Sequence, residues 1–352
     1  MNPAQTTSSA GTPPGLGARP RIPGIGPVLT LLLLAPLVAE VLSGATRLSY
    51  IFVLVPEIMV WGVGALLARE ATRRWQAGGR SLLLLGLALA IAEEIVIQQT
   101  SLAPYAWAGT SATYGRAVDV NWLWLLAMLG YESVWVVLAP VQITELLFPS
   151  RRVEPWLRRR GLAISGIVFI IGSFIAWFAW TQNARPKVFH VAKYQPPAWQ
   201  LLMGVAVIAL LILGAYKLRA SRCGQHGQKT PSPWVVGLAA FILGLGWYVL
   251  IAIAYGAIPT LPIGIPLLGG SLWAGVAFLM IERWSACLNW QDGHRLALAS
   301  GAVVACMVGG FGGSSLWPRI DLIGKVVMNL MAVILLVYLA IRQRNRSSRE
   351  SS

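Results

Sequence analysis

Long apolar stretches recur along the whole chain and are separated by short polar breaks. Each stretch is close to the ~20 residues that an α-helix needs to cross the ~30 Å hydrocarbon core of a membrane. The pattern predicts ten membrane-spanning helices, at about 25–44, 49–68, 81–101, 121–148, 161–181, 199–218, 234–256, 265–282, 296–313 and 322–341. The expected fold class is therefore all-α, a polytopic transmembrane helical bundle.

The chain divides by chemistry into four regions. Residues 1–24 are rich in Pro, Gly, Ser and Thr, a composition typical of a disordered tail. Residues 25–148 contain the first four predicted helices and every intramembrane carboxylate, and residues 149–341 contain the other six predicted helices. Residues 342–352 form a basic tail. We expect both tails to be cytoplasmic.

Composition supports the membrane assignment and charge sets the orientation. Hydrophobic residues make up 56% of the chain and charged residues 12%, against about 25% charged in soluble domains. With a cytoplasmic N-terminus, the inside segments carry 21 of the 28 Lys and Arg residues, as the positive-inside rule requires. An even number of spans then places the C-terminus inside as well. The net charge of +15 therefore indicates a bacterial-type inner-membrane protein that contacts anionic lipids at the cytoplasmic face, not a nucleic-acid partner.

Motifs for cofactors and metals are absent from the sequence. The three cysteines, at positions 223, 287 and 306, include no CxxC pair, so neither a disulfide nor a metal cluster is expected. The chain has no phosphate-binding loop, no HExxH and no Gly-x-Ser-x-Gly elbow. We expect no cofactor and no bound metal.

Small residues recur at four-residue spacing in the ninth predicted helix, at Ala297, Gly301, Ala305 and Gly309. This spacing places them on one stripe of the helix, where a neighbouring helix can approach closely. The stripe predicts a packing seam.

Six glutamates lie inside the predicted spans, although a carboxylate in hydrocarbon costs at least a few kcal/mol. With 1.5 Å of rise per residue, five of them fall into one layer in the outer half of the membrane. We call this set the carboxylate layer: Glu40, Glu57, Glu93, Glu94 and Glu132. The sixth, Glu145, reaches the inner interface near Arg151 and Arg152, where a surface ion pair is expected.

Helical geometry indicates which members of the layer share a site. Gln98 follows Glu94 by four residues and shares its face, whereas Glu93 points about 100° away. Pro36 and Pro56 precede Glu40 and Glu57, and a proline in a span bends the helix and frees a backbone carbonyl. The predicted substrate- or ion-binding site contains Glu40, Glu57, Glu94, Gln98 and Glu132.

No cation lies at the depth of this layer, so some carboxyls are expected to carry a proton at neutral pH. The leading hypothesis is a site that binds or translocates a cation or a proton-coupled small solute, with Glu94 as the titrating or ligand group and Gln98 orienting it. A second hypothesis is a layer of helix-packing pairs, with Arg47 and Arg116 reaching toward Glu40 or Glu57, in a non-catalytic membrane scaffold.

A third hypothesis comes from a resemblance. The segment Glu93-Glu94-x-x-x-Gln98 resembles the EExxxR motif of the CPBP family, the CAAX-processing and glutamic intramembrane proteases. The segment Met128-x-x-x-Glu132 stands where that family has FxxxH, the family's third motif is absent, and the three histidines, at 190, 226 and 294, fall in predicted loops. The resemblance covers about 40 residues. It implies a degenerate intramembrane hydrolase in which Glu93 and Glu94 act on water.

Overall fold

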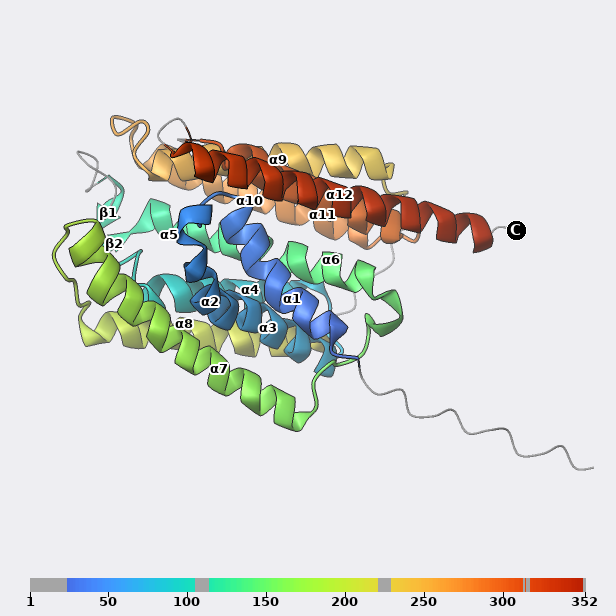
Figure 1. Cartoon of the computed structure of the whole chain (residues 1–352), viewed down its shortest axis with the longest axis horizontal. Coiled ribbons are helices and arrows are strands. Elements are labelled where there is room, and N and C mark those ends of the chain that lie inside the picture. Colours follow the sequence, from blue (N-terminus) through green and yellow to red (C-terminus); the bar gives the residue numbers. More distant parts are fainter. Residues whose placement is uncertain (1–23, 105–113, 221–228, 313, 315–316, 351–352) are drawn as a thin grey trace, which may run out of the picture.

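The computed structural model describes residues 24–104, 114–220, 229–312, 314 and 317–350 (Figure 1). These residues form a helical bundle with one small antiparallel hairpin, in which β1 (Arg116–Ala117) pairs with β2 (Val120–Asn121). The α-helices are α1 (Gly26–Pro36), α2 (Leu54–Glu57), α3 (Val63–Arg74), α4 (Gly79–Ile91), α5 (Trp122–Tyr131), α6 (Ala139–Leu147), α7 (Arg159–Trp177), α8 (Ala198–Lys217), α9 (Pro233–Ala254), α10 (Gly264–Ser285), α11 (Asp292–Gly309) and α12 (Arg319–Glu350). Short 3-10 turns cover Leu48–Val53, Pro149–Arg151 and Leu218–Ala220.

Helices occupy each of the ten apolar segments that the sequence predicts to be membrane-spanning. Within the described residues, seven continuous helices are long and apolar enough to cross a membrane: Leu48–Arg74, Trp122–Leu147, Arg159–Val188, Ala198–Lys217, Pro233–Ala254, Gly264–Ser285 and Arg319–Arg346. The apolar helix Gly26–Val41 is shorter. The all-helical fold class is confirmed, and the structure is that of a membrane protein. The predicted N-terminal tail lies outside the described residues except for Gly24, whereas α12 continues into the basic C-terminal tail.

Three layers of helices make up the bundle. The helices α9, α10, α11 and α12 lie together along one side, and α7 and α8 lie along the opposite side (Figure 1). The chain from α1 to α6 packs between them: α4 contacts α8 and α3 contacts α7, while α5 contacts α9 and α6 contacts α11. All the glutamates of the carboxylate layer belong to this central part, where helices on both sides separate them from lipid.

The small-residue stripe of the ninth predicted helix is a packing seam, as its spacing predicted. It lies on α11 and faces α9. A Cβ atom added to Gly301 would lie 2.2 Å from the carbonyl oxygen of Gly237, and one added to Gly309 would lie 2.3 Å from the ring of Tyr248. The two backbones therefore approach closely at Gly301, and the Tyr248 ring packs directly on the backbone at Gly309, so that no side chain larger than that of glycine fits at either position.

The two ends of the bundle are recognised by their contacts. At one end, which we call the Arg69 end, the Arg342 guanidinium donates to Leu147 O and the Ser81 hydroxyl donates to Ala215 O. The first bond joins α12 to the end of α6, and the second joins the start of α4 to the end of α8. At the other end, the Thr46 end, the side chain of Asp321 accepts hydrogen bonds from the backbone N–H and the hydroxyl of Ser49.

The central helices leave α-helical geometry near the glutamates. Five π-helical segments interrupt the described helices: Leu37–Val41, Ile58–Gly62, Ala92–Ile97, Glu132–Leu138 and Phe178–Val188. Four of the five contain or directly follow a glutamate of the carboxylate layer. π-Helical turns are rare and are found frequently at functional sites. Pro36 directly precedes the first segment and Pro56 lies two residues before the second, in agreement with the distortion expected from them.

Candidate functional site: the carboxylate layer

Four of the five glutamates of the carboxylate layer are buried. Glu93 and Glu57 are each 2% exposed, and Glu94 and Glu132 are little more exposed. Glu40 is half-buried. Because ionised carboxylates are almost never fully buried without a partner, the hydrogen bonds of each oxygen decide what the group can do.

Glu94 is held firmly by one of its oxygens. Its Oε2 accepts hydrogen bonds from the Thr100 hydroxyl at 2.5 Å, the Ser101 hydroxyl at 2.6 Å and the Trp124 indole N–H at 3.1 Å. The helix that carries Glu94 ends in the π-helical turn Ala92–Ile97, and the chain then folds back so that both hydroxyls reach the carboxyl. These three donors orient Glu94.

Gln98 does not take the orienting role that its spacing suggested. Its backbone N–H donates to the carbonyl of Glu93, and its side chain interacts with the Glu93 carboxyl without the geometry of a hydrogen bond. The physical reason is the π-helical turn, which abolishes the four-residue register on which the expected Glu94–Gln98 pairing depended. No sequence feature predicts this turn, because the segment Ala92–Ile97 contains neither Pro nor Gly.

Glu40 and Glu57 meet at a single hydroxyl. The Thr46 Oγ1 lies 2.5 Å from Glu57 Oε1 and 3.4 Å from Glu40 Oε2. A hydroxyl has one hydrogen, so Thr46 donates to only one of the two carboxyls. Both contacts are hydrogen bonds only when the other carboxyl carries a proton and donates it to Thr46. Sequence reasoning missed Thr46, whose position in a short connection between two helices carries no motif.

Glu93 is the least satisfied member of the layer. Neither of its carboxyl oxygens has a hydrogen-bond partner among the described residues, and the same holds for Glu57 Oε2 and Glu132 Oε2. Glu93 interacts electrostatically with Glu40, Glu57 and Glu94, and Glu132 interacts with Glu40, Glu93 and Glu94. The five glutamates from four stretches of helix are therefore one electrostatic unit, as the depth estimate predicted.

The basic residues near the layer are engaged elsewhere. The Arg47 guanidinium lies over the Trp317 ring at 5.0 Å, and the Arg116 guanidinium donates to the side chains of Asn121 and Asp119. Lys325 is buried and its ammonium group donates to Leu42 O at 2.5 Å. Within the described residues, no salt bridge joins a Lys or Arg to a glutamate of the layer.

A small cavity adjoins the layer at the Thr46 end. Its volume is about 30 Å³, the share of one water molecule in the liquid. Its walls combine polar and apolar side chains: Val41, Gly44, Thr46, Arg47, Leu48, Ile51, Trp317, Asp321, Gly324, Lys325 and Met328. Thr46 thus faces the cavity on one side and two carboxyls on the other. In the part of the chain that the structure describes, no three His, Cys, Asp or Glu side chains are grouped as ligands for a metal ion.

Glu145 lies at the opposite end in a buried ion-pair network, which we call the Arg69 network. It accepts from the guanidinium of Arg69 at 3.2 Å and from that of Arg73 at 2.6 Å. The expected surface pair with Arg151 or Arg152 is therefore wrong in both partner and burial. The Arg151 guanidinium instead donates to Gly24 O and pairs with Glu154, and the Arg152 guanidinium pairs with Asp292 at the start of α11. Only the backbone carbonyls of these two arginines contribute to the network, by accepting from Arg69.

The described histidines lie away from the glutamate pair. His294 caps the first turn of α11 at the Arg69 end and stacks on Trp290, and His190 follows the π-helical segment Phe178–Val188. His226 lies outside the described residues. Met128, at the position of the family's FxxxH phenylalanine, is buried in the main hydrophobic core.

Comparisons of the whole chain with protein-family models, with curated proteins and with solved structures found no match. The function is therefore argued from the site alone.

Proposed function

We propose that the chain is a multi-pass inner-membrane protein whose carboxylate layer binds or translocates a cation or a proton-coupled small solute. In this proposal the ten apolar segments all cross the membrane, both termini are cytoplasmic, and the Arg69 end faces the cytoplasm. Support comes from the helix found at every apolar segment and from the excess of Lys and Arg at one end.

One observation carries the functional part of the proposal. Glu93 is 2% exposed and neither of its carboxyl oxygens has a partner among the described residues. An ionised carboxylate in that position is strongly unfavourable, so the group must take up a proton or a cation. A carboxyl with a purely structural role would have its donors built in, as Glu94 has.

The neighbouring groups suggest a division of roles. Glu93 and Glu132 are the groups that gain and lose the proton or cation. Glu94, whose carboxyl is fixed by three donors, maintains the geometry of the site. Glu40, Thr46 and Glu57 connect the site with the small cavity at the Thr46 end, which is the outside face in the proposed orientation. Gln98, beside Glu93, supplies an amide as a further ligand.

Transport by the purified full-length chain in proteoliposomes tests the proposal. Proton movement is followed with an enclosed pH-sensitive dye while Na⁺ or K⁺ gradients are applied, or a panel of small solutes is added. The wild-type chain is expected to dissipate or build a pH gradient in response to at least one of these probes. Glu93→Gln, which keeps the shape but removes the titratable group, is expected to abolish this response.

The control is Glu154→Gln, which removes an exposed carboxylate outside the layer. It should leave the flux unchanged. Wild-type flux in Glu93→Gln, at equal expression and thermal stability, would overturn the role of the layer. A wild-type chain that moves no probe would overturn the transport proposal as a whole.

A second candidate function rests on the pairing of an unpartnered carboxyl with a fixed one. Glu93 next to the anchored Glu94 is an arrangement in which one carboxyl can polarise water while the other holds its position, which keeps a CPBP-like hydrolase as the alternative. Incubation of the purified chain with prenylated peptides or lipids, followed by mass spectrometry of the products, distinguishes it. Cleavage that disappears in both Glu93→Gln and Glu94→Gln would favour the hydrolase over the transporter.

A further inference from the structure

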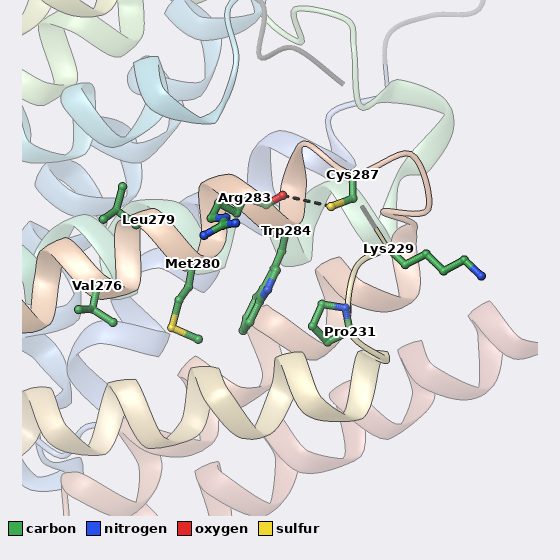
Figure 2. Close-up of a pocket in the computed structure, with 8 residues that line it drawn as sticks. All are labelled: Lys229, Pro231, Val276, Leu279, Met280, Arg283, Trp284 and Cys287. Atoms are coloured by element: carbon green, nitrogen blue, oxygen red, sulfur yellow. Dashed lines mark hydrogen bonds between the residues drawn. The ribbon is translucent and has the colours of Figure 1, made fainter. Parts of the chain in front are cut away.

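A second cavity lies far from the carboxylate layer, between the end of α10 and the start of α9 (Figure 2). Its volume is about 400 Å³, within the range of roughly 300–1,000 Å³ that is typical of ligand-binding sites. The lining residues are Lys229, Pro231, Val276, Leu279, Met280, Arg283, Trp284 and Cys287. We call this cavity the α9–α10 groove.

The lining changes from apolar to basic along α10. Leu279, Met280 and Arg283 follow Val276 by three, four and seven residues, so the four side chains share one face of the helix. Val276 and Leu279 are exposed, as is the guanidinium-bearing Arg283 at the last turn. Figure 2 shows the Trp284 ring extending between Met280 and Pro231, where it forms a wall of the groove.

The charges at the groove are of one sign. Arg283 and Lys229 are its charged lining residues, and both are cationic. The neighbouring carboxylate, Glu282, is bound to Arg80 at 2.5 Å. Figure 2 shows the Lys229 side chain pointing away from the other lining residues, which leaves Arg283 as the principal anchor for an anion.

We propose that the α9–α10 groove is a specific binding site for one anionic phospholipid. Arg283 holds the phosphate, and an acyl chain lies along Val276 and Leu279 and continues over the exposed Leu272. A free anion would leave the apolar wall without a partner, and an uncharged lipid would leave Arg283 without one. The combination of both surfaces at one groove at the Arg69 end, which carries the excess of basic residues, matches an anionic amphiphile.

Lipid retention by the detergent-purified full-length chain tests this proposal. Native mass spectrometry measures the first lipid bound when phosphatidylglycerol or phosphatidylcholine with the same acyl chains is titrated. Phosphatidylglycerol is expected to bind about tenfold more tightly, a difference of about 1.4 kcal/mol. The reason is that the choline ammonium of phosphatidylcholine offsets the charge of its phosphate and is repelled by Arg283. Arg283→Gln should remove this preference, whereas Arg160→Gln, which changes an exposed arginine at the same end but outside the groove, should keep it.

A second variant tests the apolar wall. Leu279→Trp fills the groove and is expected to reduce the binding of both lipids. The thermal stability of the protein should not change, because Leu279 lies on an exposed face of α10. Equal binding of the two lipids by the wild-type chain, or an unchanged preference in Arg283→Gln, would overturn the proposal. Displacement of phosphatidylglycerol by millimolar inorganic phosphate would also overturn it, because the groove would then be a site for free anions.

Discussion

The Arg69 network and the carboxylate layer both contain buried glutamates of the same central helices, but the hydrogen bonding of these glutamates differs between the two regions. Arg69 has five N–H donors, and each has an acceptor: Glu145 Oε1, Glu70 Oε1 and the carbonyls of residues 151, 152 and 154. In the carboxylate layer four carboxyl oxygens have no partner among the described residues. The same residue type is therefore fully neutralised at one end and left unmatched near the other.

This difference indicates a structural role for the Arg69 network and is consistent with the binding role proposed for the carboxylate layer. The Arg69 network ties the loop after α6 onto α3: Glu70 accepts from the backbone N–H groups of Trp156 and Leu157, and the Arg69 guanidinium lies 3.5 Å from the centre of the Trp156 ring. Because every N–H donor of Arg69 already has an acceptor within the protein, this network offers no free donor to a ligand. The unmatched oxygens of Glu93 require a proton or a cation that the protein itself does not supply.

Removal of Arg69 is expected to have the largest effect on stability. Arg69→Met strips Glu145 and Glu70 of a buried partner, and breaking a buried pair costs about 3–5 kcal/mol. The measurement is the unfolding free energy in detergent, with Arg160→Met as a control that should not change it. If Arg69→Met unfolds no more easily than the control, the network is not the structural element that its hydrogen bonds indicate.

Replacement of Glu93 should act in the opposite direction. Glu93→Met keeps the volume and removes two unpartnered polar atoms, and the cost of burying an unsatisfied group is about 1–3 kcal/mol. We expect a gain in thermal stability of about 1–2 kcal/mol together with a loss of transport, the exchange typical of functional sites. A loss of stability would show that Glu93 has a structural partner and would remove the contrast between the two regions.

The sequence predicted the helices well because apolar length is a local property. Each apolar segment lies on a helix, and the depth estimate alone grouped five glutamates into one electrostatic unit. The hydrogen-bond partners were not predictable in the same way. Thr100 and Ser101 reach Glu94 only through the fold-back after a π-helical turn, and Trp124 reaches it from α5. The partners of Glu145 depend on how α3 packs near α6. Periodicity carries no information on either contact.

The hydroxyl of Thr46 offers a smaller test of the layer. Thr46→Val keeps the shape and removes the hydrogen bond to Glu57, which is expected to cost about 1 kcal/mol and to weaken transport. Thr46→Ser retains the hydroxyl and should restore both properties. Equal behaviour of the Val and Ser variants would mean that the side chain acts by packing alone, and the connection between Glu40 and Glu57 would have no role.

The smallest expected effect concerns a second arginine at the Arg69 end. Arg152 pairs with Asp292 at 2.5 Å, but the two side chains are 20% and 41% exposed. Ion pairs that reach solvent contribute about 0–1 kcal/mol and are screened by salt. Arg152→Gln is therefore expected to lower the unfolding free energy by less than about 1 kcal/mol, and the loss should shrink further when unfolding is measured at high NaCl concentration. An effect as large as that of Arg69→Met would show that proximity to the network, and not burial with every donor satisfied, determines what an arginine contributes at this end of the bundle.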